Sequence, residues 1–204
     1  MAEHYYTEKP QSEIKEKHFE YRISGHILKF MSVSGVFAFE NKVDKASELL
    51  ITHFKPSGAH PSLLDCGCGF GPIAISIKVL YPHLDVFAVD INERAVDYAR
   101  KNDDLNNIYI NALKSDLYNE LEGLSFGDIV SNPPIAAGKA VNTRLIREAC
   151  DHLVPGGALQ IVAFHNKGGE TLKGIMHDTF GNAEDVVKSG GIRVYRSVKS
   201  KQIS

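Results

Sequence analysis

The sequence predicts an α/β protein built on a doubly wound, seven-stranded and mostly parallel sheet that ends in a C-terminal antiparallel hairpin. Two observations predict this fold. From residue 62 onwards, short buried apolar runs alternate with stretches of helical length, a pattern typical of βαβ units. Near the C-terminus, two strand-like runs flank Gly190-Gly191, which predicts a hairpin closed by a tight turn.

The first 40 residues are expected to form an arm followed by a small β extension. Residues 1–20 are polar and contain tyrosines, and residues 21–40 alternate in the manner of two short strands. Residues 43–54 have helical apolar spacing, which ends before the loop Pro56-Ser57-Gly58. We therefore expect an N-terminal arm with short strands at 1–40 and a main domain at 41–204, within one globular unit.

The main domain is expected to contain all seven strands of the sheet. They are SLLDCG (62–67), LDVFAVD (84–90), IYINAL (108–113), GDIVSN (127–132), ALQIVAF (158–164), AEDVVKS (183–189) and IRVYRSV (192–198). Helices are expected at 72–82, 92–106, 140–153 and 169–180. Pro72 suits a first helical turn and Asn92 an N-cap, and Pro155-Gly156-Gly157 is expected to end the third of these helices.

Composition is that of an ordinary globular protein. Of the 204 residues, 43% are hydrophobic and 24% are charged. No apolar run reaches the roughly 20 residues that cross a bilayer, and the N-terminus lacks the basic and apolar regions of a signal peptide. We therefore expect a cytoplasmic protein with no membrane partner.

The net charge of -2 argues against a protein coated in positive charge, although a local basic patch suffices to bind RNA. One such patch is the C-terminal stretch 188–201. Its five cations are Lys188, Arg193, Arg196, Lys199 and Lys201, with no acid among them. Two interpretations stay open, a solvated edge strand and a nucleic-acid contact.

The three cysteines do not indicate a metal or redox site. Cys66 and Cys68 are separated by one residue, whereas zinc sites use spacings such as C-x2-C and four ligands. With Cys150 the count is odd, which gives no disulfide framework. We expect no metal and interpret Cys66 as a small core residue.

Candidate site residues follow the strands, where ligands bind in such sheets. The first group is Asp65-x-Gly67-x-Gly69-x-Gly71, a tighter loop than the dinucleotide motif G-x-G-x-x-G. The acid suits a cationic ligand group, such as an amino group or a sulfonium. The glycines allow the backbone to approach a ligand closely; the alternative is an ordinary glycine turn.

Two further acids follow the next two strands. Asp90 is placed to hold ribose hydroxyls, with a helix N-cap as the alternative. A carboxylate at Asp116 could accept from an adenine amino group, but taken alone Asp116 is better explained as a turn residue.

The fourth group is Ser131-Asn132-Pro133-Pro134-Ile135. Prolines cannot continue a central strand, so the pair predicts a stiff turn. That turn directs the Asn132 amide and the Pro133 carbonyl outward as two acceptors for the N–H groups of a planar amine. The lone pair of the amine then faces an electrophile. The alternative is an ordinary Asn-Pro turn.

These four groups, in this order, resemble the class I S-adenosylmethionine-dependent methyltransferases over roughly residues 40–200. SGVFAFENKVDKASELLI (34–51) and NPPIAAGK (132–139) are similar to the methyltransferase-small family. That family includes 16S ribosomal RNA guanine-N2 methyltransferases and short archaeal single-domain relatives. The resemblance implies a Rossmann-like fold and S-adenosylmethionine as the cofactor.

The resemblance also implies roles for individual residues. The cofactor would contact Asp65, Gly67, Cys68, Gly69, Gly71, Asp90, Ile91, Asp116, Leu117 and Asn132. The catalytic turn would be Asn132, Pro133, Pro134 and Ile135. The substrate would contact Phe37, Asp44, Ile135 and Lys139. The family often has an aromatic residue where Ile135 stands, so a stacking contact with the base is partly lost.

The expected function is methylation of an exocyclic amine, guanine N2 of rRNA or tRNA, with RNA as the partner. The sequence specifies no oligomeric state. A protein glutamine N5-methyltransferase of the release-factor type and a DNA adenine methyltransferase are alternatives, against which Ile135 weighs. A cofactor-binding protein that assists a partner without catalysis is a further alternative, against which the intact Asn132-Pro133-Pro134 weighs.

Overall fold

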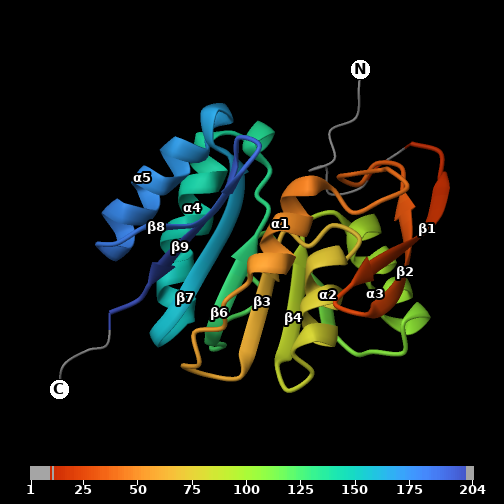
Figure 1. The fold of residues 1–204 in the computed structure, drawn as a ribbon, viewed down its shortest axis with the longest axis horizontal. Helices are drawn as coiled ribbons and strands as arrows, with labels where there is room; N and C mark the ends of the chain where they lie inside the picture. The colour runs from red at the N-terminus through yellow and green to blue at the C-terminus, as the bar shows by residue number, and fades with distance from the viewer. Residues whose placement is uncertain (1–9, 11, 201–204) are drawn as a thin grey trace.

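A computed structural model describes residues 10 and 12–200 of the chain and contains a seven-stranded sheet with strand order β5-β4-β3-β6-β7-β9-β8 (Figure 1). Five strands are parallel: β3 (Ser62–Cys66), β4 (Asp85–Asp90), β5 (Asn111–Lys114), β6 (Phe126–Ser131) and β7 (Leu153–Phe164). The hairpin of β8 (Glu184–Ser189) and β9 (Ile192–Val198) pairs antiparallel to β7 through β9. The predicted Rossmann-like sheet and its C-terminal hairpin are confirmed. The expectations for Lys201 and for residues 1–9 and 11 lie outside the described residues.

Helices cover both faces of the sheet, so the fold has three layers (Figure 1). On one face lie α1 (Lys45–His53), α2 (Pro72–Leu80) and α3 (Glu93–Leu105), and on the other lie α4 (Lys139–His152) and α5 (Gly169–Phe180). Because side chains alternate along a strand, Leu63 packs into the first core and Leu64 into the second. Two short 3-10 turns, Ile135–Ala137 and His165–Lys167, precede α4 and α5.

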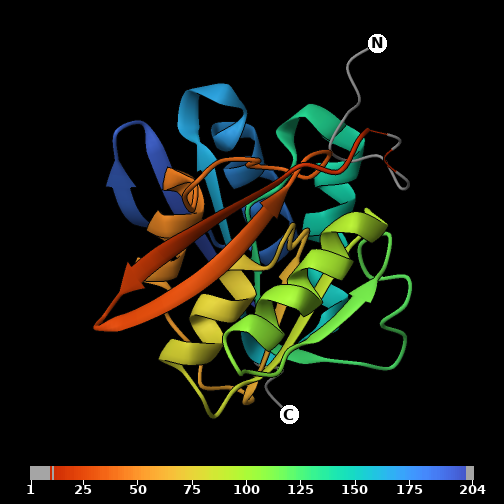
Figure 2. The same ribbon diagram turned by 90° about the vertical axis from the view of Figure 1, so that its right-hand side faces the viewer.

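The N-terminal β extension is an antiparallel hairpin of β1 (Glu16–Ile23) and β2 (His26–Val33) that lies across the helices of the first face (Figure 2). It is tied to α3, where Asn102 Oδ1 accepts from Met31 N at 2.8 Å. Tyr21 and Phe30 are buried in the same core as the sheet residues. The two predicted strands exist, but they start five residues earlier than expected, because Glu16 to Glu20 pair with β2.

Other element boundaries agree with the sequence except in two places. Pro72 is the first residue of α2 and Asn92 caps α3, both as expected. Strand β5 is shorter than predicted and begins at Asn111. The helix α4 ends at His152, and Pro155-Gly156-Gly157 lies within β7 rather than before it.

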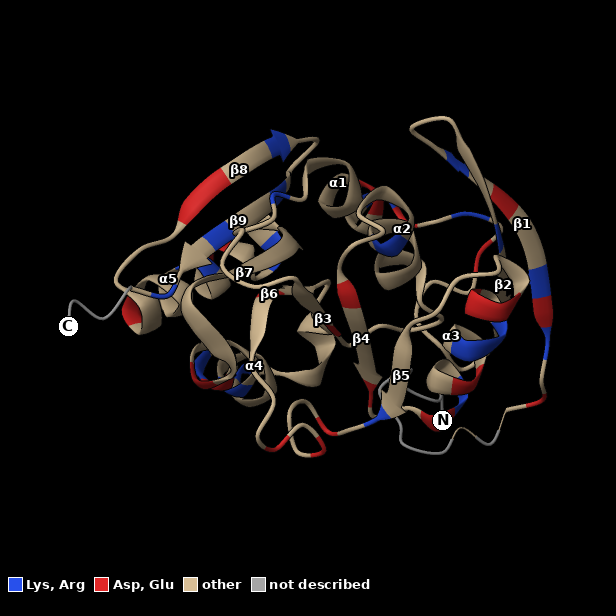
Figure 3. Ribbon diagram, turned by 90° about the horizontal axis from the view of Figure 1, so that it is seen from below, with Lys and Arg blue, Asp and Glu red and all other residues tan. Residues whose placement is uncertain are grey.

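Three cations of the basic C-terminal stretch pair with two acids of β8 (Figure 3). Lys188 and Arg193 lie 3.0 and 3.7 Å from Asp185, and Arg196 lies 3.4 Å from Glu184. Strand β8 forms the edge of the sheet, whereas β9 lies inside it. These pairs favour the structural interpretation of the stretch over a nucleic-acid contact.

None of the helices in the described part of the chain is long and apolar enough to cross a membrane.

The parallel strands bring the candidate residues together. The sheet order reverses at β3, which has β4 and β5 on one side and β6 on the other. Ligands bind at such a switch point, outside the carboxyl ends of the strands. The loops after β3, β4, β5 and β6 carry the four predicted groups and meet at this edge of the sheet.

Candidate active site

A cavity of about 320 Å³ opens at the carboxyl ends of β3, β4, β5 and β6. Residues from all four predicted groups line it, together with Val36 and Phe37 from the segment before α1. The predicted site residues that line this cavity are Phe37, Gly67, Gly69, Asp90, Ile91, Asp116, Leu117, Asn132, Pro133 and Pro134. The structure thus brings these ten residues together at one cavity, whereas six predicted residues lie outside its lining: Asp44, Asp65, Cys68, Gly71, Ile135 and Lys139.

The glycine loop after β3 needs glycine for two separate reasons. Gly67, Gly69 and Gly71 have φ angles of +81°, +56° and +89°, which side chains disfavour. A Cβ on Gly67 would meet no protein atom within 4 Å, so this glycine leaves space on the cavity side. A Cβ on Gly71 would lie 3.3 Å from Ala99, so that glycine allows α2 to approach α3. Gly71 therefore has a structural role, because it allows the helix that follows the loop to pack closely against α3.

Asp65 lies behind the loop and is fully buried. Its Oδ2 accepts from the backbone N of Ala74 at the start of α2, at 3.1 Å. Its Oδ1 has no hydrogen-bond partner among the described residues. Burial, with a further contribution from the charge of Asp90, raises the pKa of Asp65 to about 7. Asp65 is thus a buried carboxyl group whose pKa lies close to neutral pH and whose Oδ1 lacks a hydrogen-bond partner among the described residues.

Asp90 closes β4 and both of its oxygens accept backbone hydrogens. Oδ2 accepts from Gly69 N and Oδ1 from Asn92 N, each at 2.9 Å. Burial raises the pKa of Asp90 to about 6. The alternative role as an N-cap is wrong, because Asn92 itself caps α3 and accepts from Arg94 N at 3.0 Å. A carboxylate has about four lone-pair sites, so Asp90 retains capacity for a ligand.

Asp116 lies at the cavity and is held by a residue that the sequence did not indicate. Arg144 of α4 donates to Asp116 Oδ2 at 2.8 Å and to Asp116 O at 3.0 Å. Leu117 has a φ of +53°, and Ser115 Oγ donates to Leu117 O at 2.8 Å. Asp116 is therefore part of a tight turn and also lines the cavity, so the two interpretations of this residue are compatible.

Asn132 follows β6 and has its amide fixed by α1. Its Nδ2 donates to Asp44 Oδ1 at 3.3 Å and to Ser47 Oγ at 3.1 Å. Asp44 caps α1 and accepts from Ala46 N at 3.0 Å. Because both partners are acceptors here, the amide nitrogen faces α1, and the structure records no hydrogen bond to Asn132 Oδ1 among the described residues. The orientation leaves an acceptor for a ligand at the cavity.

Asp44 borders a small adjoining cavity of about 20 Å³ that also contacts Phe37, Gly67 and Asn132. Asp44 and Phe37 thus lie at the border of the pocket, as expected. Ser47, three residues after the helix cap, was missed by the sequence analysis. The only signal for it is its place in the first turn of a helix that starts with an aspartate.

Ile135 and Lys139 do not share the main cavity. They line a separate one of about 230 Å³, between the start of α4 and α5. Ile135 is 38% exposed and packs against Gly168, where an added Cβ would lie 3.1 Å from its Cγ2. Ile135 was expected at the catalytic turn together with Asn132; in the structure it belongs to the short 3-10 turn Ile135–Ala137 and lines this second cavity.

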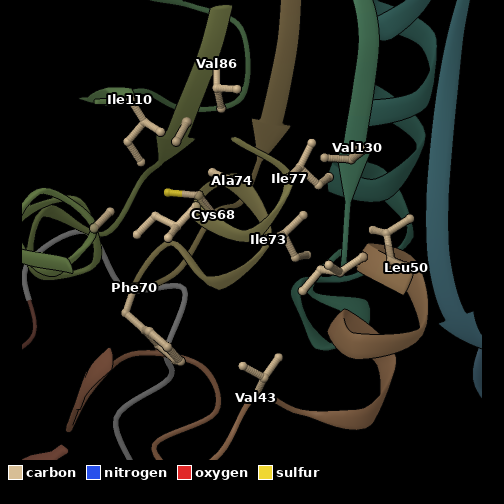
Figure 4. Close-up of a cluster of buried hydrophobic side chains, with 14 of the residues drawn as sticks. Val43, Leu50, Cys68, Phe70, Ile73, Ala74, Ile77, Val86, Ile110 and Val130 are labelled. Carbon is tan, nitrogen blue, oxygen red and sulfur yellow. The ribbon is translucent and has the colours of Figure 1, made fainter. Parts of the chain in front are cut away.

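The cysteines are packing residues. Cys66 and Cys68 are buried and belong to the two hydrophobic cores on opposite faces of the sheet, and Figure 4 shows Cys68 among the apolar side chains of one core. Burial raises the pKa of both thiols. Over residues 10 and 12–200 no group of three or more His, Cys, Asp and Glu side chains is placed to hold a metal ion.

The profile of the family described as Methyltransferase small domain matches residues 27–196. The chain belongs to this family. It is 33% identical over its full length to an uncharacterized protein, YbxB, of Bacillus subtilis, which it also covers completely. It is 31% identical, over 90% of its length, to the ribosomal RNA small subunit methyltransferase C of Salmonella arizonae, and it spans 52% of that protein.

Solved structures agree with this assignment. The fold is similar to the T. thermophilus 16S rRNA N2 G1207 methyltransferase RsmC, solved in complex with AdoMet and guanosine, with a TM-score of 0.78 and 26% identity. The similarity covers 93% of this chain and 52% of RsmC. A methyltransferase from Pyrococcus furiosus shares the fold, with a TM-score of 0.65 and 24% identity over 76% of this chain and 82% of that one.

Proposed function

We propose that the chain is an S-adenosylmethionine-dependent methyltransferase that modifies the exocyclic N2 amine of guanine in ribosomal RNA of the small subunit. The chain is a member of the methyltransferase small family, and two of its relatives are small-subunit rRNA methyltransferases by name. The T. thermophilus relative acts on guanine N2 and was solved with AdoMet and guanosine. These relatives are about twice as long, so the substrate is inferred for this chain from the shared part alone.

The observation that carries the proposal is the orientation of Asn132. Asp44 and Ser47 accept both hydrogen bonds recorded from its Nδ2. Its Oδ1 is thereby turned away from α1, next to the Pro133 residue that lines the same cavity. Amide and carbonyl oxygens are acceptors only. A pair of acceptors matches the two N–H groups of an aromatic amine.

The residues of the main cavity fit the proposed cofactor. The loop at Gly67 has space where a side chain would stand, and Asp90 and Asp116 offer carboxylate acceptors for hydroxyl and amino groups. Apolar side chains such as Ile91 and Leu145 provide faces for an adenine ring. Asp65 is fully buried outside the cavity lining, and its recorded hydrogen bond holds the start of α2 behind the loop.

S-adenosylmethionine, when bound, supplies an electrophilic methyl group carried on a sulfonium. Asn132 Oδ1 and the Pro133 carbonyl accept hydrogen bonds from the two N–H groups of the target amine. They fix the amine so that its lone pair points into the main cavity, and this positioning supplies much of the rate enhancement. The extra proton of the amine leaves to water after the transfer, so the chain needs no dedicated strong base. A base inside a helix must first be turned out of its stack.

The proposal is tested by methyl transfer from labelled S-adenosylmethionine to unmodified 16S rRNA, tRNA and a release factor, each offered separately. The Asn132→Ala variant removes the acceptor. The Asn111→Ala variant is the matched control, because Asn111 lies at the amino end of β5 and its side chain bonds to Tyr109 and Asp85. Nucleoside analysis identifies the product.

We expect label in 16S rRNA as N2-methylguanosine, a loss of at least about 100-fold in Asn132→Ala, and wild-type rates in Asn111→Ala. Label on the release factor would instead assign the chain to the glutamine methyltransferases. N2-methylguanosine in tRNA alone would support the proposed reaction but would make tRNA, and not ribosomal RNA, the substrate. Tight cofactor binding with no transfer to any of the three would favour a non-catalytic partner protein.

A further inference from the structure

A second cavity lies behind the Asn132–Ile135 turn. It measures about 230 Å³ and is bounded by the first residues of α4 and by α5, which pack side by side (Figure 1). Ile135, Leu172 and Ile175 give it an apolar wall, and Lys139, Asn142 and Thr171 contribute polar groups. Its volume is below the usual range for sites that take a whole drug-sized ligand, so it has room for one small planar group.

The polar group that marks this cavity as a binding site is Asn142. It is 4% exposed, and its Nδ2 donates to Gly138 O at 2.9 Å and to Pro134 O at 3.3 Å. Because both partners are carbonyl acceptors, the amide nitrogen must face them. The Oδ1 atom then has no partner among the described residues. A buried acceptor without a donor is costly. Asn142 lines the cavity, so a small shift of its side chain would bring Oδ1 within reach of a ligand N–H group, which would remove that cost.

The charge at the rim of the cavity points to a nucleotide. Lys139 is exposed, and the structure records no acid paired with it among the described residues. An ammonium group at the mouth of a small apolar cavity suits a phosphate attached to a planar base. The side chains of Ile135 and Leu172 would contact the faces of that base, and Asn142 Oδ1 would accept from one of its N–H groups.

The position of the cavity identifies which nucleotide this is. Pro134 lines the main cavity, the next residue Ile135 lines the second, and Asn142 bonds to the Pro134 carbonyl. The two cavities therefore lie on either side of the turn that is proposed to hold the target amine and of the start of α4, whose residues line both. A nucleotide attached to the target by one phosphate would place its base on the far side of this turn.

We propose that the second cavity binds the base that neighbours the methylated guanine in single-stranded RNA, with Asn142 and Lys139 as its polar contacts. This inference rests on the proposed function. It implies that the enzyme recognises part of the RNA sequence through the second cavity, on the side of the turn that faces away from the cofactor. Ile135 then contacts the neighbouring base rather than the target base, which accounts for an aliphatic residue at a position that is often aromatic in the family.

The test measures binding, so it does not depend on turnover. The probes are fluorescein-labelled RNA pentamers with one central guanosine, either intact or with an abasic ribose on the 5′ or the 3′ side of it. Anisotropy titrations use the full chain with S-adenosylhomocysteine present. Thr171→Tyr fills the cavity from α5, and His177→Tyr, at an exposed position on the same helix, is the matched control.

We expect Thr171→Tyr to weaken binding of the intact pentamer about tenfold and His177→Tyr to leave it unchanged. One of the two abasic pentamers binds the wild type about tenfold more weakly, and Thr171→Tyr weakens that pentamer no further, because the two changes remove the same contact. Lys139→Ala is expected to make the plot of the logarithm of the binding constant against the logarithm of the salt concentration less steep, by the amount that corresponds to about one phosphate contact. Guanosine alone binds Thr171→Tyr as it binds the wild type.

Two results overturn the inference and leave the proposed function intact. They are equal binding of the intact pentamer by the wild type and Thr171→Tyr, and additive effects of the substitution and the abasic site. A wild type that binds neither guanosine nor any pentamer contradicts the proposed function itself, and with it this inference. A thermal melt checks that Thr171→Tyr folds, and Ile175→Phe fills the cavity from a second position if it does not.

Discussion

Asn132 donates its Nδ2 to Oδ1 of Asp44 over 3.3 Å, which links two residues that are 88 positions apart in the chain. The same Asp44 oxygen accepts from the backbone N atoms of Ala46 and Ser47 and caps α1. One carboxylate oxygen therefore fixes both the start of a helix and the direction of the amide after β6. The orientation of the proposed catalytic amide depends on the N-terminus of α1.

Substitution of Asp44 separates these two roles. Asp44→Ala loses the cap and is expected to lower the free energy of unfolding by about 0.5–2 kcal/mol. Asp44→Ser keeps a capping oxygen but is too short to reach Asn132, so it retains most of the stability. Both variants are expected to lower kcat for methyl transfer at least tenfold. Urea titrations and steady-state rates measure the two effects, and an Asp44→Ser enzyme with wild-type kcat would contradict the coupling.

Alanine at two glycines of the loop after β3 is expected to affect two different properties, the stability of the fold and the affinity for the cofactor. Gly71→Ala places a Cβ 3.3 Å from Ala99 at a φ of +89°, and is expected to destabilise the fold by about 1–3 kcal/mol. Gly67→Ala meets no protein atom within 4 Å but projects at the main cavity, and is expected to weaken S-adenosylmethionine binding at least tenfold.

Gly58→Ala supplies the baseline for both, because Gly58 has a φ of +71° and open space around it, far from the cavity. Denaturant unfolding and isothermal titration distinguish the variants. If Gly67→Ala bound the cofactor normally and behaved like Gly58→Ala, the loop would not face the ligand.

The stability of the free protein is expected to depend on pH through Asp65. Its pKa in the folded state is about 7, against about 4 in an unfolded chain. Between these values the folded state holds a proton that the unfolded state has released, so the free energy of unfolding falls as pH rises from about 4 to about 7. Asp65→Asn keeps the acceptor for Ala74 N and removes the titration, so the fall becomes shallower.

The size of this change is about 1.4 kcal/mol for each unit by which the two pKa values differ. Urea midpoints at several pH values measure it, with Asp178→Asn at an exposed position of α5 as the control. Some slope remains in Asp65→Asn, because burial also raises the pKa of Asp90. A slope identical to that of the wild type would show that Asp65 does not titrate in this range.

Arg144 is expected to support cofactor binding through Asp116. The guanidinium bonds to Asp116 and, at 2.7 Å, to Glu148. Arg144→Ala frees the turn after β5 and is expected to weaken S-adenosylmethionine binding about fivefold to tenfold. The change in unfolding free energy is expected to stay below about 1 kcal/mol, because the pair is partly exposed. Arg147→Ala, at an exposed position of α4, is the control; equal affinities in the two variants would exclude this role.

The sequence predicted the local elements of the fold well and the long-range contacts poorly. The Gly190-Gly191 hairpin and the Asn92 cap depend on neighbouring residues, and both are confirmed. The start of β7 was misplaced because Gly157 pairs with a distant segment, where Lys199 N donates to Gly157 O at 2.9 Å. Proline and glycine alone predict a loop there, and the pairing that extends the strand is not visible locally.

The same distinction applies to the candidate site. Residues directly after strands, such as Gly67 and Asn132, were located because parallel strands end at one edge. Ser47 and Arg144 were missed, since each acts through a partner 85 or 28 positions away. The place of Ile135 beside a second cavity was not foreseen, because the short helical turn that follows the prolines was not predicted.

The central claim is that Asn132 and Pro133 hold the N2 amine of a guanine, and replacement of guanosine by inosine tests it most directly. Inosine keeps the ring and lacks only that amine. Transcripts of small-subunit rRNA made with guanosine or with inosine are offered with labelled S-adenosylmethionine. The account predicts N2-methylguanosine in the first transcript and no label in the second. Equal label in both transcripts would place the methyl group elsewhere and contradict the account.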